Sequence, residues 1–162
     1  MSEILYKAIG VIRSEHVEPE KTPIQPRFAA DCEGRVEIFP EYAEGLQDIE
    51  GFSHIYLIYH LDRSKGFKLL VKPFLQDVVR GVFATRAPSR PNPIGISIVE
   101  IIERKGNTLF VKGLDILDNT PLLDIKPYSV KFDNIKTRKN GWQDDVDEKT
   151  AQKRGRRDYK SD

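Results

Sequence analysis

The sequence has little cysteine and no long apolar run, and both shortages restrict the class of protein. A single cysteine, Cys32, excludes an intrachain disulfide. No apolar stretch approaches the roughly 20 residues that a membrane-spanning helix needs. The first ten residues also lack the basic region and long apolar core of a signal peptide. We therefore expect a cytoplasmic protein that folds in a reducing compartment.

The motifs of several large enzyme classes are also absent. The chain contains no GxGxxG, no P-loop and no GxSxG, which argues against a Rossmann nucleotide-binding domain. His54 and His60 fall on one expected strand, about 20 Å apart at ~3.3 Å per residue, too far to share one metal ion. Cys32 has no ligand pattern beside it. We therefore expect no metal site and interpret both histidines as packed or hydrogen-bonded within a sheet.

What the chain does contain is a regular series of strand-like segments. Its 162 residues are 39% hydrophobic and 31% charged, as in a globular protein with one core. Turn signals recur about every ten residues, which is typical of an antiparallel sheet closed into a barrel or stacked as a sandwich. Short helical turns are expected at 41–48 and 73–77. The expected strands are 4–13, 35–39, 52–61, 81–86, 95–104, 107–117 and 121–132.

The apolar pattern fades after about Phe132. We therefore predict a mainly all-β domain over 1–132, folded as a barrel or sandwich, and a charged tail over 133–162, partly extended or disordered, with Trp142 as its one large apolar anchor. Residues 131–162 hold ten basic against seven acidic side chains and include "KRGRR" at 153–157. Such a tail either binds a polyanion such as nucleic acid or is simply a solvated chain end.

The stretch "GVFATRAPSRPNPIGIS", 81–97, concentrates rigid and polar residues beside the core. Prolines at 88, 91 and 93 fix the backbone, so the loop loses little entropy when it binds a ligand. Arg86 and Arg90 offer forked donors for a carboxylate or phosphate, and Asn92 can match a donor–acceptor pair. The pattern fits either a stiff polar wall for a ligand or a proline-rich connection with solvated arginines.

Carboxylates interrupt the apolar run "KGLDILDNTPLLDIKPY", 112–128. Asp115 and Asp124 lie within strand-like segments, where an unpaired charge is costly, so each either stabilises the fold or faces a ligand. Asp124 and Lys126 share one strand face and can form an ion pair. Asp62 and Arg63 follow another expected strand. There they serve either as binding groups or as an exposed ion pair.

Four blocks together resemble the TsaA-like, TrmO-type family. They are "IGVIRS", "GLQDIEGFSHIYLIYHLDRS", "GVFATRAPSRPNPIGIS" and "LDILDNTPLLDIKPY", and they span most of 9–128. The resemblance implies a single-sheeted β-barrel and a homodimer with its cofactor near the subunit interface. It implies S-adenosylmethionine-dependent methylation of N6 of N6-threonylcarbamoyladenosine, at position 37 of certain tRNAs. The alternatives are a non-catalytic barrel that binds S-adenosylmethionine or RNA, and a methyltransferase for another small substrate.

The resemblance also assigns site residues. Asp124 and Tyr128 are candidates for a base that activates the poorly nucleophilic N6. Arg90, Asn92 and Lys126 are expected either to lie near the substrate or to order the loop. Longer family members add a C-terminal domain that helps hold tRNA, so the basic tail could substitute in part. The expected cofactor-binding residues are Pro26, Arg27, Phe28, Asp62, Arg63, Arg86, Ile96, Lys112, Gly113, Leu114 and Asp115.

Overall fold

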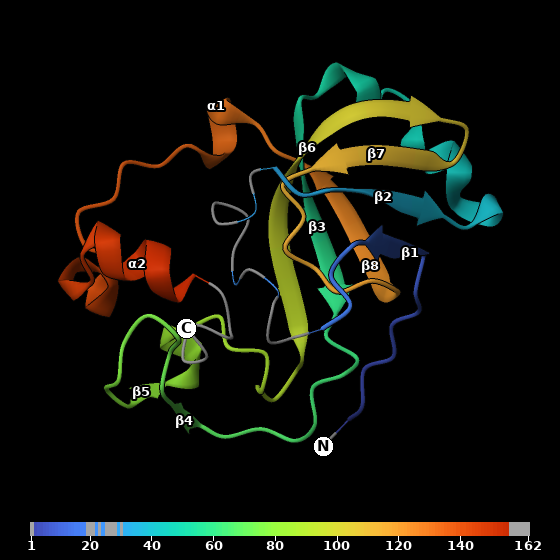
Figure 1. The fold of residues 1–162 in the computed structure, drawn as a ribbon. Helices are drawn as coiled ribbons and strands as arrows, with labels where there is room; N and C mark the ends of the chain where they lie inside the picture. The colour runs from blue at the N-terminus through green and yellow to red at the C-terminus, as the bar shows by residue number, and fades with distance from the viewer. Residues whose placement is uncertain (1, 19–21, 23, 25–28, 30, 156–162) are drawn as a thin grey trace.

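The computed structural model describes residues 2–18, 22, 24, 29 and 31–155, and a closed antiparallel β-barrel forms its main body (Figure 1). The strand order around the barrel is β1-β2-β7-β6-β3-β8, and β8 closes the sheet by pairing with β1. The predicted single-sheeted barrel is therefore confirmed. The barrel strands are β1 (Gly10–Ser14), β2 (Glu33–Ile38), β3 (His54–His60), β6 (Ile94–Lys105), β7 (Thr108–Lys112) and β8 (Thr120–Pro127).

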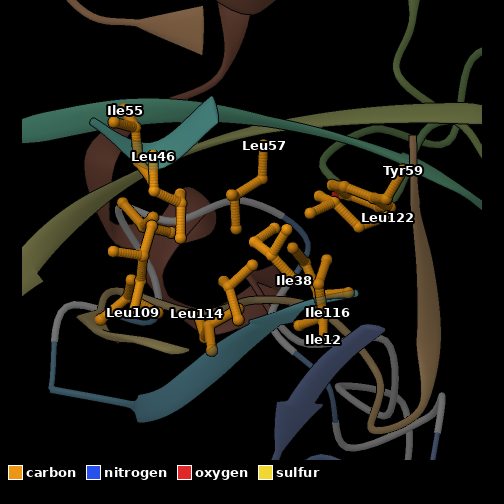
Figure 2. Close-up of a cluster of buried hydrophobic side chains, with 13 residues drawn as sticks. Ile12, Ile38, Leu46, Ile55, Leu57, Tyr59, Leu109, Leu114, Ile116 and Leu122 are labelled. Carbon is orange, nitrogen blue, oxygen red and sulfur yellow. The ribbon is translucent and has the colours of Figure 1, made fainter. Parts of the chain in front are cut away.

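Side chains that alternate along the strands fill the barrel interior. In β3, Ile55, Leu57 and Tyr59 are buried while the residues between them are only partly covered, as the two-residue period of a strand requires. Figure 2 shows these side chains meeting others from β1, β2, β7 and β8 in one cluster. His54 and His60 lie at the two ends of the same outward row, as the sequence predicted.

An excursion between β3 and β6 departs from the predicted strands. Residues 81–86 do not form a strand of the barrel: β4 (Leu70–Val71) pairs with β5 (Arg80–Gly81), and the 3-10 turn η5 (Val82–Ala84) follows. The helical turn expected at 73–77 is present as a single turn, closed by a hydrogen bond from Gln76 N to Pro73 O. The turn expected at 41–48 is present as the 3-10 helix η3 (Pro40–Leu46), and a second turn, η4 (Ile49–Gly51), follows it.

The described part of the C-terminal segment, 133–155, which we expected to be partly extended or disordered, contains short helical elements. After α1 (Val130–Asp133) come the 3-10 turn η6 (Gly141–Asp145) and the helix α2 (Glu148–Arg154). Figure 1 shows α2 on the side of the molecule that carries β4 and β5. Trp142 Nε1 donates to Ala84 O at 2.7 Å, and Arg154 forms an ion pair with Asp77 at 2.8 Å. None of the described helices is long and apolar enough to cross a membrane.

Candidate functional site

A pocket of about 390 Å³ opens where β3 ends and β6 begins. Segments far apart in the sequence line it: the end of β3, the proline loop 85–93, the start of β6, and the connection between β7 and β8. Of the residues predicted to bind a cofactor, these segments bring together Asp62, Arg63, Arg86, Ile96 and Asp115. The pocket therefore brings together side chains from three separate blocks of the sequence.

A second hollow of about 570 Å³ adjoins the first along the proline loop. Arg86 and Ile96 line both, so the two hollows meet at this wall. The lining of the second hollow is more apolar and includes Tyr56, Phe74 and Trp142. The C-terminal segment therefore forms part of the site, which the sequence did not indicate beyond the single large apolar residue in a polar region.

The proline loop is held in place by its own hydrogen bonds. Arg90 Nη1 donates to the carbonyl oxygens of Thr85 and Ala87, at 3.0 and 3.1 Å. Ser64 Oγ donates to Pro88 O at 3.0 Å and ties the loop to the chain that leaves β3. Arg90 thus orders the loop from within. Arg90 also lines the pocket, so a contact with the incoming nucleotide stays a prediction.

Asp115 lies in the pocket wall and is almost fully buried, at 6% exposure. It accepts a hydrogen bond of 2.6 Å from Ser97 Oγ, which lies 2.8 Å from the Tyr59 hydroxyl. A buried carboxylate needs such partners to offset the loss of hydration. The sequence predicted that Asp115 needs a partner but gave no sign that Ser97 and Tyr59 supply the network.

Glycine makes this network possible. A Cβ atom on Gly95 would lie 2.2 Å from Tyr59 Cε2, far inside van der Waals contact. Gly95 pairs with Tyr59 across β6 and β3, so the tyrosine ring fills the space that a side chain would occupy. The glycine of the proline-rich block therefore positions Tyr59, and through it the hydroxyl that contacts Ser97.

The residues before Asp115 hold the strand end and do not line either hollow. Gly113 has φ of 89°, a conformation that favours glycine, and the N–H groups of Gly113 and Leu114 both donate to Cys32 O, at 2.8 and 3.1 Å. The Leu114 side chain is fully buried in the core, and Lys112 lies at the end of β7 opposite Glu33. The contacts of Lys112, Gly113 and Leu114 therefore fix the backbone that leads into Asp115.

Other predicted residues lie outside both hollows. Asp124 forms the predicted ion pair with Lys126 at 3.3 Å on an exposed face of β8, and it also accepts from Ile125 N at 2.9 Å. Asn92 lies in the proline loop, where its backbone carbonyl oxygen accepts a hydrogen bond of 2.7 Å from Ile94 N. The structure therefore does not place Asp124, Lys126 or Asn92 beside Asp115 and Arg86.

Tyr128 lies just beyond β8 in a group of aromatic rings. Its ring centre is 5.7 Å from that of Tyr56 and 6.5 Å from that of His54. Tyr56 belongs to the lining of the second hollow, so this group borders the site. Partial burial and then the Asp133 carboxylate raise the pKa of the Tyr56 phenol.

The loop predicted to contact the cofactor through Pro26, Arg27 and Phe28 lies outside the described residues. Ile24, just before this loop, lines both hollows. Among the described residues, the sequence reasoning also missed Lys65 and Ser64, which line the pocket beside Arg63. Their position directly after the "LDR" of the second block was the available signal.

Comparison with known proteins identifies the family of this chain. The family model described as the tRNA-methyltransferase O N-terminal domain matches residues 11–134. A probable S-adenosyl-L-methionine-binding protein of Pyrococcus abyssi is 58% identical over 139 residues, which cover 86% of this chain and 76% of that protein. A tRNA (adenine(37)-N6)-methyltransferase of Escherichia coli is 37% identical over 138 residues, 79% of this chain and 59% of that enzyme.

Solved structures agree with this assignment. A crystal structure of TrmO has a TM-score of 0.74 and 37% identity, with 86% of this chain and 64% of that chain covered. A crystal structure of TrmO from Pseudomonas aeruginosa has a TM-score of 0.72 and 34% identity, covering 86% of this chain and 62% of that one. The chain thus spans less than two thirds of these solved chains. With the barrel, the pocket and the matched blocks in agreement, the chain belongs to the tRNA-methyltransferase O N-terminal domain family.

Proposed function

We propose that this protein is an S-adenosylmethionine-dependent tRNA methyltransferase that acts on N6 of adenosine at position 37. The observation that carries the proposal is the pocket in which Asp62, Arg63, Arg86 and Asp115 converge from separate family blocks. Relatives named as tRNA (adenine(37)-N6)-methyltransferases and as S-adenosyl-L-methionine-binding proteins support it. The pocket volume also lies in the usual range for small-molecule sites.

The chemistry of the pocket fits the proposed cofactor. S-adenosylmethionine carries a carboxylate, an ammonium group, a sulfonium and ribose hydroxyls, and it supplies an electrophilic methyl group when bound. An arginine fork such as that of Arg86 suits the carboxylate. Asp62 and Asp115 suit the cationic groups or the hydroxyls. Pro26, Arg27, Phe28 and the Lys112–Leu114 segment remain part of this proposal through the family resemblance.

The chain's own contribution to methyl transfer is chiefly positioning, because the leaving thioether is neutral and little charge needs to be neutralised. The ordered proline loop and the Ser97–Asp115 hydrogen bond provide a preformed wall for this purpose. We extend the proposal to N6-threonylcarbamoyladenosine as the substrate. Its urea-like N6 is a weak nucleophile, so we propose that a base assists. Tyr128, whose ring lies beside Tyr56 of the second hollow, is the stronger candidate, and Asp124, paired with Lys126 outside both hollows, is the weaker one. The aromatic group around Tyr128 favours a contact with the target base.

We also propose a homodimer in the cytoplasm, with the pocket near the subunit interface. The outer face of β6 exposes Ile94, Ile96, Ile98 and Ile102, at 37 to 50%. Ile94, Ile96 and Ile98 form a continuous apolar row, which Glu100 separates from Ile102, and such a row favours contact with a partner. Ile96 is common to this row and to both hollows, so a dimer contact there would border the site. Sedimentation of the purified chain at two concentrations tests this directly.

The decisive experiment incubates the purified protein with methyl-labelled S-adenosylmethionine and tRNA, with and without prior threonylcarbamoylation. Label only in the threonylcarbamoylated tRNA supports the full proposal. Label in both tRNAs supports the methyltransferase but rejects the finer substrate. Arg86→Ala should abolish labelling, whereas Arg35→Ala, on the exposed face of β2, should not. Cofactor binding measured by calorimetry without any labelling would favour the non-catalytic alternative.

A further inference from the structure

Glu15, His16 and Cys32 form a group of possible metal ligands outside the proposed cofactor pocket. One ligand atom from each residue lies within 4.8 Å of the other two. The sequence did not predict this group because Cys32 is far along the chain from both other residues. The barrel brings them together: β1 pairs with β2, and Ser14 lies opposite Gly34. Residues just after β1 therefore meet the residue just before β2.

A hydrogen bond sets the state of the histidine. His16 Nε2 lies 2.7 Å from the carbonyl oxygen of Leu114. A carbonyl oxygen only accepts, so Nε2 must carry the proton, and Nδ1 of the neutral ring then has the free lone pair. Metal-binding histidines commonly donate their other N–H to a backbone carbonyl in this way. The backbone of Leu114 thus prepares His16 as a ligand through Nδ1.

The electrostatic surroundings favour a cation. Glu15 brings a carboxylate to within 4.8 Å of the Cys32 sulfur, and a carboxylate and a thiolate this close together repel each other. A divalent cation reverses this local balance because it neutralises the carboxylate and stabilises the thiolate. The same group of side chains is therefore unfavourable for an isolated thiolate and favourable for a bound metal ion.

From this geometry we propose that Glu15, His16 and Cys32 bind a divalent cation of the zinc class. Sulfur, imidazole nitrogen and carboxylate oxygen are all ligands of Zn²⁺, whereas Mg²⁺ and Ca²⁺ select oxygen alone. Tetrahedral zinc ligands lie roughly 3.5 Å apart, so on binding the three side chains close in from separations of up to 4.8 Å. Binding releases the thiol proton to solvent. These residues supply three ligands, which leaves a fourth position for water or another donor.

The site is connected to the proposed cofactor pocket through one backbone segment. His16 binds Leu114 O, and Cys32 O accepts from the N–H groups of Gly113 and Leu114. Asp115, in the pocket wall, is the next residue. A metal ion that fixes His16 and Cys32 therefore also fixes the segment that carries Asp115. This linkage, unlike the metal site itself, rests on the proposed function: zinc should tighten S-adenosylmethionine binding.

The test is a titration of the tag-free, full-length, reduced protein with Co²⁺. We expect one equivalent to produce a thiolate-to-cobalt charge-transfer band in the near ultraviolet, which Zn²⁺ removes by displacement. Cys32→Ser should abolish this band, and Glu15→Gln and His16→Ala should weaken binding at least tenfold. The matched controls are His60→Ala, on the outer face of β3, and Glu3→Gln, on the exposed N-terminal segment. Circular dichroism confirms that each variant is folded.

No charge-transfer band, or an unchanged band in folded Glu15→Gln and His16→Ala, would overturn the metal site. The linkage has its own measurement, the S-adenosylmethionine affinity with and without one equivalent of Zn²⁺. We expect about fivefold or greater tightening in the unmodified protein and none in Cys32→Ser. Equal affinity in both conditions would overturn the linkage. Absence of S-adenosylmethionine binding in both, with the cobalt band present, would contradict the proposed function and leave the metal site standing.

Discussion

At the scale of single residues, the clearest requirement is for glycine at position 95, where no larger side chain fits. The Cβ of Gly95→Ala would meet the Tyr59 ring, which is buried at 7% exposure and fixed at its hydroxyl by Ser97. The ring must shift, and forced overpacking of this kind costs about 1–3 kcal/mol of unfolding free energy. We expect a lower melting temperature and weaker S-adenosylmethionine binding. Gly45→Ala is the control, because its Cβ would meet nothing within 4 Å; an equal loss there would refute the steric explanation.

A second residue-scale prediction concerns the hydroxyl between Tyr59 and Asp115. Ser97→Ala removes the donor to a buried carboxylate and the partner of the Tyr59 hydroxyl. Leaving a buried polar group without its partner costs about 1–3 kcal/mol, so denaturant unfolding should show a loss of that size. Ser97→Thr keeps the hydroxyl and should recover most of the stability. If alanine and threonine behave alike, the hydroxyl does not support Asp115.

At the scale of elements, the C-terminal helix α2 depends on one cap. Asp147 accepts a hydrogen bond of 2.6 Å from Thr150 N, and this bond lowers the pKa of its carboxyl below the ordinary value. A lowered pKa in the folded chain stabilises α2 at neutral pH, and the stabilisation is lost as pH falls through the folded-state value. Docking of α2 should therefore weaken in acid.

Trp142, the only tryptophan, reports on this docking because it binds Ala84 O and lines the second hollow. Its fluorescence should change between neutral pH and pH about 3, before the barrel unfolds. Asp147→Ser keeps a capping oxygen without an acidic proton, so the part of the change due to the cap should disappear. An identical acid transition in Asp147→Ser would show that another carboxyl is responsible.

For the proline loop, sequence reasoning predicted some features of the element and missed others. Three prolines and two arginines indicated a rigid polar wall, and the structure places Arg86 in the pocket. The bonds from Arg90 back to loop carbonyls were not predictable, because they depend on how the loop closes on itself. Residues 81–86 were also misread as a strand of the barrel. Their apolar side chains suit a strand, but only Gly81 belongs to one, β5, which pairs with β4.

For the whole molecule, alternating apolar residues and regular turns were sufficient to predict a β-barrel or sandwich, and the family blocks selected the barrel. The pairing of β1 with β8, which closes the sheet, joins chain segments about a hundred residues apart and has no local signal. The same is true of Ser97 beside Asp115 and of His16 beside Cys32. Contacts of this kind follow from topology, and the sequence alone could only indicate that Asp115 needs a partner.

The last prediction concerns how the whole molecule holds RNA. Lys149 and Lys153 are exposed on α2, while Arg154 is paired with Asp77. Because Glu148 and Ala151 of α2 line the second hollow, we expect the lysines of this helix to contact tRNA phosphates. The double variant Lys149→Gln and Lys153→Gln should weaken tRNA binding and reduce the slope of log affinity against log salt by about one for each lost contact. Lys105→Gln, on the β6–β7 hairpin, is the control for general charge. An unchanged slope in the double variant would mean that α2 is structural, and that the barrel surface around the pocket supplies the phosphate contacts.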